Sequence, residues 1–178
     1  MKTGFVFLAT VGLLLTSCNS RPSLEKYFVA HTEDKNFIAL DVSPTILNVD
    51  NSKLSPAQKH ALQSFDKMNI LAFKVNDKNK SQFVAEKAKV DLILKDKKYQ
   101  QLMKFASGKE GASVSFVGDG ETIDEFVLYA NKKESGFAVV RILGKDMNPT
   151  SIMSMLSILQ TSKIDIAQLK PLQELLDK

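Results

Sequence analysis

The sequence predicts an α+β fold, a single domain in which an antiparallel sheet of about six strands, including a meander, carries helices packed on one face. Three observations support this prediction. In the first half of the chain, helical patterns with a 3.6-residue period alternate with short apolar runs. In the second half, strand patterns are separated by turns that contain glycine. No linker rich in Pro, Gly or Ser divides the chain, so we expect one domain over residues 25–178.

The first half of the chain predicts two helices and two buried strands. Ser23 is a favourable N-cap for a helix whose apolar face carries Leu24, Tyr27, Phe28 and His31. The short apolar run Phe37–Val42 predicts a strand. Residues 55–58 predict the start of a second helix, because they offer a Ser N-cap, a Pro at the first helical position and a Gln that completes a capping box. Met68–Val75 predicts the second strand.

A third helix is predicted from Ser81 to about Lys95, because apolar residues recur there between Glu and Lys. The residues expected on its buried face are Phe83, Val84, Ala88 and Leu92. Periodicity alone leaves the next segment, Tyr99–Phe105, open between helix and strand.

A meander and a helical end complete the predicted fold. Its strands are Ser113–Val117, Phe126–Ala130 and Phe137–Leu143, and Gly118-Asp119-Gly120 suits a hairpin loop because glycine tolerates positive φ. Asn148-Pro149 predicts the start of a helix that carries Ile152, Met153, Leu156 and Leu159. The tail from Ile164 to Leu176 is helical in composition, and Pro171 either kinks it or starts a new helix.

The first eighteen residues have the layout of a secretory signal. Lys2 supplies a positive n-region, Gly4–Leu15 are apolar, and the chain's single cysteine is Cys18. Leu15-Thr16-Ser17-Cys18 matches the bacterial lipobox, which predicts removal of the signal peptide 1–17 and a diacylglycerol thioether on Cys18. An ordinary signal cut near Ser17 would leave a free thiol instead, and a spanning helix needs roughly 20 apolar residues. We expect a lipidated tether over residues 18–24 that binds the membrane.

Charge is unevenly distributed along the mature chain, whose net charge after loss of Lys2 is weak. Residues 67–104 hold ten lysines against four acidic residues. This Lys-rich middle either forms a solvated helix face, which we favour, or rests against anionic headgroups. We do not expect nucleic acid as a partner, because an exported protein rarely meets it and no stacking aromatics interleave with the lysines.

Candidate catalytic and metal-binding residues are sparse. The sequence holds no nucleophile elbow, zinc-protease helix or phosphate-binding glycine loop. His31 and His60 stand apart from carboxylates or thiols at ligand spacing, so we expect no metal, no cofactor and no enzymatic activity. Asp41 is an acidic residue within an apolar strand, and a buried carboxylate is costly unless paired. It therefore sits at the strand's end, forms a hydrogen-bonded lock, or belongs to a site; we favour the first two.

Several of these segments together resemble a known family. They are the lipobox, the early amphipathic helix, Phe37–Pro44, Met68–Val75, Tyr99–Met103, the hairpins and Gly136–Gly144. The set is similar to small lipoproteins of Bacteroidota grouped as domain of unknown function four-two-five-two. The resemblance covers most of the mature chain, but the tail after Leu159 is longer than it leads us to expect. It implies a strand at Tyr99–Phe105 and brings no established activity, catalytic residue or cofactor. Gene neighbours in the family suggest envelope sensing by association only.

We expect a lipid-anchored envelope protein that is a non-catalytic interaction or sensing module with a protein partner. The alternative is a carrier of an apolar ligand or lipid, suggested by Met147, Met153, Met155, Leu156 and Leu159 over a curved sheet, although core packing explains such a stripe more simply. An enzyme ranks third. Because no acidic run follows Cys18, we expect an outer-membrane anchor that faces the periplasm. The sequence predicts no oligomeric state.

Overall fold

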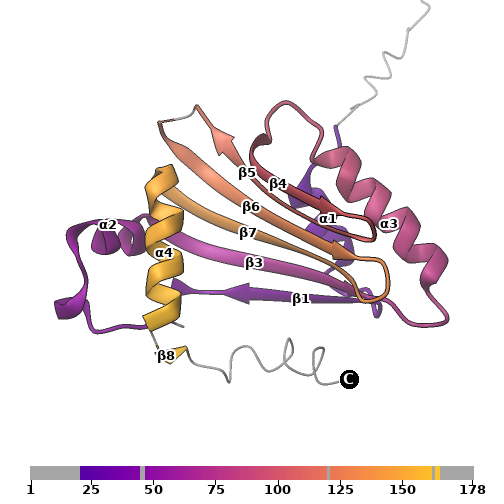
Figure 1. Cartoon of the computed structure of the whole chain (residues 1–178), viewed down its shortest axis with the longest axis horizontal. Coiled ribbons are helices and arrows are strands. Elements are labelled where there is room, and N and C mark those ends of the chain that lie inside the picture. The colour runs from indigo at the N-terminus through magenta and orange to yellow at the C-terminus, as the bar shows by residue number, and fades with distance from the viewer. Residues whose placement is uncertain (1–20, 45–46, 120, 162, 165–178) are drawn as a thin grey trace, which may run out of the picture.

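The computed structural model describes residues 21–44, 47–119, 121–161 and 163–164 (Figure 1). Six strands form one antiparallel sheet in the order β1-β3-β7-β6-β5-β4. They are β1 (Phe37–Val42), β3 (Phe65–Lys74), β4 (Gln100–Ser107), β5 (Glu110–Gly118), β6 (Ile123–Lys132) and β7 (Gly136–Met147). A separate short ladder pairs β2 (Leu47–Asn48) with β8 (Lys163–Ile164). The helices are α1 (Leu24–His31), the short 3-10 helix η2 (Asn51–Lys53), α2 (Pro56–Ser64), α3 (Lys80–Ile93) and α4 (Pro149–Thr161). The predicted α+β fold class is confirmed.

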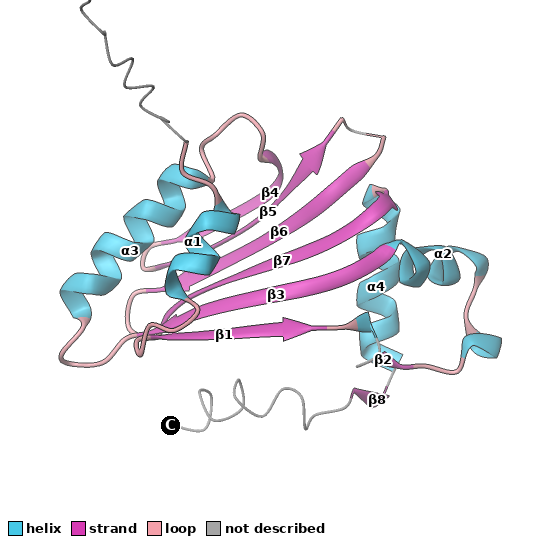
Figure 2. Cartoon of the chain, turned by 180° about the vertical axis from the view of Figure 1, so that it is seen from behind, coloured by secondary structure: helices cyan, strands magenta, loops and turns pink. Residues whose placement is uncertain are grey.

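The chain order explains the sheet. Strands β5, β6 and β7 form the predicted meander of neighbouring antiparallel strands, and β4 extends it by one more strand. Helix α3 carries the chain from β3, inside the sheet, to β4 at its far edge (Figure 2). The segment that the family resemblance assigned to a strand is β4.

The helices lie on both faces of the sheet, which corrects the expectation of one covered face (Figures 1 and 2). Side chains of α1 and α3 pack on one face, and side chains of α2 and α4 pack on the other. The physical reason is visible in β3, where the four consecutive residues from Ile70 to Phe73 are all buried and so point alternately to both faces. A strand of this kind needs cover on two sides.

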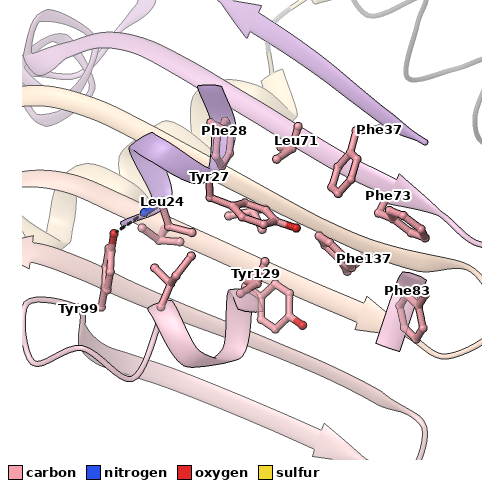
Figure 3. Close-up of a cluster of buried hydrophobic side chains, with 14 residues drawn as sticks. Leu24, Tyr27, Phe28, Phe37, Leu71, Phe73, Phe83, Tyr99, Tyr129 and Phe137 are labelled. Atoms are coloured by element: carbon pink, nitrogen blue, oxygen red, sulfur yellow. Dashed lines mark hydrogen bonds between the residues drawn. The ribbon is translucent and has the colours of Figure 1, made fainter. Parts of the chain in front are cut away.

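The core under α1 and α3 is aromatic (Figure 3). Phe73 of β3 and Phe137 of β7 stack with ring centroids 5.6 Å apart, and Phe37 of β1 meets Phe73 edge to face at 5.1 Å. Helix α1 contributes Leu24 and Tyr27 from the face that the sequence predicted. The second core, under α2 and α4, is mainly aliphatic and contains Val42, Ala61, Ile70, Met155 and Ile158.

Local sequence signals set several boundaries as predicted. The Ser23 hydroxyl accepts a hydrogen bond from the Lys26 N–H at the start of α1. Strand β1 has the predicted bounds, and α2 begins with the complete Ser55 and Gln58 capping box. Strand β3 begins three residues earlier than predicted, because α2 passes into it at Phe65 without a loop. Apart from Ile164, the predicted helical tail lies outside the described residues.

The buried face of α3 differs from the prediction. Val84 and Leu92 are 63% and 62% exposed, and Ala88 is exposed as well. The buried residues are Phe83, Glu86, Val90 and Ile93. The helix is rotated toward Glu86 because that carboxylate finds partners on α1, and hydropathy alone places a glutamate on the outer face.

A glycine in the hairpin that joins β6 to β7 provides a stability test. Gly136 has φ 130°, and a Cβ there would lie 1.8 Å from the Phe73 carbonyl oxygen. Gly108 also has positive φ, but nothing lies within 4 Å of its Cβ position. We expect Gly136→Ala to lower the free energy of unfolding by about 3 kcal/mol or more, and the control Gly108→Ala by about 1 kcal/mol. Urea unfolding measures both, and equal losses would contradict the close approach at Gly136.

Candidate functional site

The residues singled out from the sequence lie in different parts of the molecule. Cys18 lies outside the described residues. Asp41 is exposed on the edge strand β1, where its carboxylate accepts a hydrogen bond from the Asn69 side-chain amide directly opposite on β3. His60 is exposed on α2, and His31 is mostly buried at the end of α1. The structure does not bring Asp41, His31 and His60 into one site.

His31 belongs to a polar cluster between α1 and α3 that sequence reasoning missed. Its centre is Glu86, which is 5% exposed. The Tyr27 hydroxyl donates to Glu86 Oε2 over 2.8 Å, and His31 Nε2 lies 3.3 Å from the same oxygen. Lys89 Nζ lies 2.8 Å from Oε1, and Asp34 lies 3.4 Å from His31 Nδ1. Glu86 is therefore fully partnered, and the cluster fastens α1 to α3.

The environment of this cluster suits a structural role. Burial is the main cause that raises the pKa of the Tyr27 hydroxyl; its hydrogen bond to Glu86 and the negative charge of Glu86 add to the effect. Tyr27 therefore stays protonated and remains a donor. The His31 ring stacks on Phe37 with centroids 4.2 Å apart. Within the described part of the chain, no three His, Cys, Asp or Glu side chains are placed to hold a metal ion.

A second buried polar pair lies under α1 on the same face of the sheet. Arg141 donates to both carboxylate oxygens of Glu125, over 2.6 Å from Nε and 3.1 Å from the terminal nitrogen. Burial opposes the charged guanidinium, but the hydrogen bonds and charge of Glu125 outweigh it and raise the pKa of Arg141. The Phe28 ring lies 5.5 Å from the guanidinium carbon. A bidentate pair of this kind positions strands β6 and β7 and leaves no free charge for chemistry.

The opposite face of the sheet carries an apolar row that none of the described helices covers, and we call this row the open shelf (Figure 1). It is one row of side chains, each opposite the next in the strand register: Ile38, Ala72, Ala138, Ala130, Ala112 and Phe105. Figure 1 views this face: α4 crosses the left end of the sheet, and no described helix lies in front of the right end, where the shelf is. A hollow of about 730 Å³ lies along it.

The open shelf consists mostly of small side chains and ends at the aromatic side chain of Phe105. Of its four alanines, Ala72 is buried among its neighbours and Ala138 is half-buried, so only Ala130 and Ala112 are exposed, whereas Phe105 on the edge strand β4 is 58% exposed. The next row on the same face ends in Met103, which is 66% exposed. Exposed large apolar side chains that adjoin one another are uncommon on a soluble protein and mark interaction sites.

Strand β4 is also an open edge. All eight of its residues are exposed, and in the described part of the chain it pairs with β5 alone. The edge has a bulge between Gln101 and Met103 and a charged residue, Lys104. Both features are common on edge strands, where they oppose unspecific pairing with other chains. From Met103 to Ser107 the register with β5 is regular. The outward backbone groups of this half pair with no described strand and could accept a further strand.

None of the described helices is both long and apolar enough to cross a bilayer. The family model described as "Domain of unknown function (DUF4252)" matches residues 27–155, which begin inside α1 and end inside α4. No curated protein and no solved structure matches the chain.

The buried tyrosines predict how stability depends on pH. Burial, followed by the charge of Asp91, raises the pKa of the Tyr129 hydroxyl above its ordinary value of 10.0, as burial also does for Tyr27. A raised pKa in the folded state favours the neutral hydroxyl, so its contribution to stability is complete below about pH 10 and falls above it. We expect Tyr129→Phe to reduce the alkaline fall in unfolding free energy by about 1.4 kcal/mol per pH unit.

Urea unfolding between about pH 9 and pH 11.5 measures this difference in slope. Lysines titrate in the same range in both proteins, so their contributions cancel in the comparison. An identical slope for Tyr129→Phe and the unaltered protein would contradict a buried neutral hydroxyl at Tyr129.

Proposed function

The chain belongs to the family described as a domain of unknown function (DUF4252), and we propose that it is a lipid-anchored, non-catalytic module that docks a partner protein at β4. The observation that carries this proposal is the junction of the open shelf with the open edge of β4 at Phe105. Backbone groups along the edge supply hydrogen bonds to a partner, and the apolar side chains beside them supply specificity.

The geometry indicates what kind of segment would dock. A seventh strand beside β4 would place alternate side chains on the two faces of the sheet. Those on the shelf side would meet Met103 and Phe105, so they should be apolar. Those on the other side would meet Lys104, which faces the α3 side together with Ser113 of β5, so an acidic residue fits there. The proposed occupant is an extended segment with apolar residues at every second position.

Docking of a protein is favoured over the carriage of an apolar ligand. The stripe that suggested a carrier does not line a shared hollow: Met155 is buried in the second core, and Met147 is buried in a separate cluster with Phe116 and Phe126. Met153 is 65% exposed on α4. The side chains of Leu156 and Leu159 are among those that the structure does not describe. Core packing accounts for the two buried methionines.

The proposed anchor is Cys18. A diacylglycerol and an amide-linked chain hold a protein stably, since each buried methylene contributes about 0.8 kcal/mol and a single chain binds only reversibly. The described domain begins a few residues later, so it would stand close to the bilayer, facing the periplasm from the outer membrane. We propose this location together with the lipidation.

Lipidation of Cys18 is tested by metabolic labelling. We expect a palmitate analogue to label the protein in living cells and Cys18→Ala to abolish the label, because no other cysteine can form the thioether. Separation by gel and detection of the attached analogue measure the result. An unlabelled wild-type protein would overturn the anchor while leaving the docking proposal intact.

Docking at β4 is tested by photocrosslinking in intact cells. A photoreactive phenylalanine at Phe105 should give one discrete adduct, whereas the same residue at Val29, which is 75% exposed on α1, should give none. In the protein that carries the photoreactive residue at position 105, Met103→Asp should lower the adduct yield about tenfold or more. The substitution removes an apolar side chain from the interface with the partner and places a charge there that must be desolvated. Equal adducts at Phe105 and Val29 would argue against a docking edge. The adduct's partner peptide, identified by mass spectrometry, should show alternating apolar residues.

A further inference from the structure

A loop rich in lysine joins α3 to β4, and we call its three exposed cations, Lys95, Lys97 and Lys98, the lysine loop. None of the three takes part in an ion pair among the described residues. Other lysines of the same region are paired: Lys87 lies 2.6 Å from Asp91, and Lys89 lies 2.8 Å from Glu86. The lysine loop therefore presents three ammonium groups to solvent against the single carboxylate of Asp96.

The one acidic residue within the loop is engaged locally. Asp96 Oδ1 accepts a hydrogen bond from the Lys98 backbone N–H over 3.1 Å, and the Asp96 carbonyl accepts one from the Tyr99 N–H. These two bonds hold the turn between α3 and β4. Lys98 Nζ lies 4.7 Å from the Tyr99 ring centroid.

The lysine loop is tied to the point where the chain enters the domain (Figure 3). The Leu24 N–H, at the start of α1, donates a hydrogen bond to the Tyr99 hydroxyl over 3.2 Å, and Leu24 itself is fully buried. Figures 1 and 2 both show the start of α1 beside the end of α3. The residues that precede Leu24 therefore depart from the domain next to these three lysines.

The length of the tether limits how far the lysine loop can be from a lipid on Cys18. Five residues separate Cys18 from Leu24, and an extended chain spans at most about 3.6 Å per residue. The start of α1 then stays within about 20 Å of the acylated sulfur. Charges act on a surface over about 8 Å at physiological salt. A tether no longer than about 20 Å lets the lysine loop approach the bilayer to within that distance.

We propose that the lysine loop rests on the anionic headgroups of the membrane that the Cys18 acyl chains enter, and so orients the domain. This inference rests on the lipidation proposed above. Arg21 in the tether adds a further positive charge. The end of the molecule that carries α2 lies away from the loop in both views and would point toward the periplasm.

The experiment uses a chain that begins at Asn19, which lacks the lipid and keeps every described residue. Its sedimentation with vesicles of phosphatidylcholine is compared with that of vesicles containing phosphatidylglycerol. We expect binding only to the anionic vesicles, and binding that falls as salt is added. Lys95→Gln, Lys97→Gln and Lys98→Gln together should weaken it about 100-fold, the effect of three near-surface lysines at about 1 kcal/mol each.

The matched control removes the same charge at the other end of the molecule. Lys53→Gln, Lys59→Gln and Lys67→Gln together should leave binding within about fivefold of the unaltered chain, which is the effect of roughly one lysine. Replacement of the loop lysines by Arg should retain binding, since the charge is kept. Thermal unfolding checks that each variant is folded.

Four outcomes would overturn the proposal. They are equal loss in the two triple variants, unchanged binding after removal of the loop charges, equal binding to neutral vesicles, and displacement by free phosphate. Because the chain used here has no lipid, failure of this experiment is distinguishable from failure of Cys18 labelling. Free phosphate at the concentration of the headgroups should not displace the protein; displacement would indicate a soluble anion as the ligand.

Discussion

The rest of the structure depends on one constraint: both faces of the sheet are apolar, and the helices cover them unequally. Six strands at about 4.8 Å spacing span about 24 Å, whereas a helix covers about 10 Å. On one face α1 and α3 share the aromatic core. On the other, α2 and α4 are both bound to one end, because α2 runs directly into β3 at Phe65 and α4 follows β7 after Met147. The chain connections therefore leave the opposite end of this face without cover from any described helix (Figure 1).

The composition of the open shelf fits its exposure. Four of its six positions are alanine, so the row exposes little apolar area for its length, and the larger Ile38 and Phe105 lie at its ends. Rows nearer to α4 carry the larger side chains Ile70 and Val140, which pack in the second core. Side chains on this face are therefore large where α4 covers the sheet and small where it does not. The large exposed side chain of Phe105 lies on the edge strand, where the sheet ends.

Local signals in the sequence were sufficient for much of this fold. Capping residues predicted the starts of α1 and α2, and a six-residue apolar run predicted β1 at its observed bounds. Features that depend on distant residues were not predictable. Glu86 is buried because Tyr27, fifty-nine positions earlier, donates a hydrogen bond to it. The hydrophobic periodicity of α3 alone cannot predict a contact with so distant a residue. The open shelf likewise requires the register of six strands, although each of its alanines is visible in the sequence.

The hydrogen bonds of α1 link the two surfaces proposed to bind, the lysine loop and the open edge of β4. Tyr27 holds α1 to α3 through Glu86, and Leu24 holds its first residue to Tyr99. Since hydrogen bonds involving charged or buried groups resist breakage more than exposed ones, the start of α1 is fixed relative to the sheet. A lipid on a short tether would then be attached to a segment that cannot rotate relative to the sheet. Tyr99 is followed directly by Gln100, the first residue of β4, so an orientation set at the lysine loop also sets the direction in which the open edge faces.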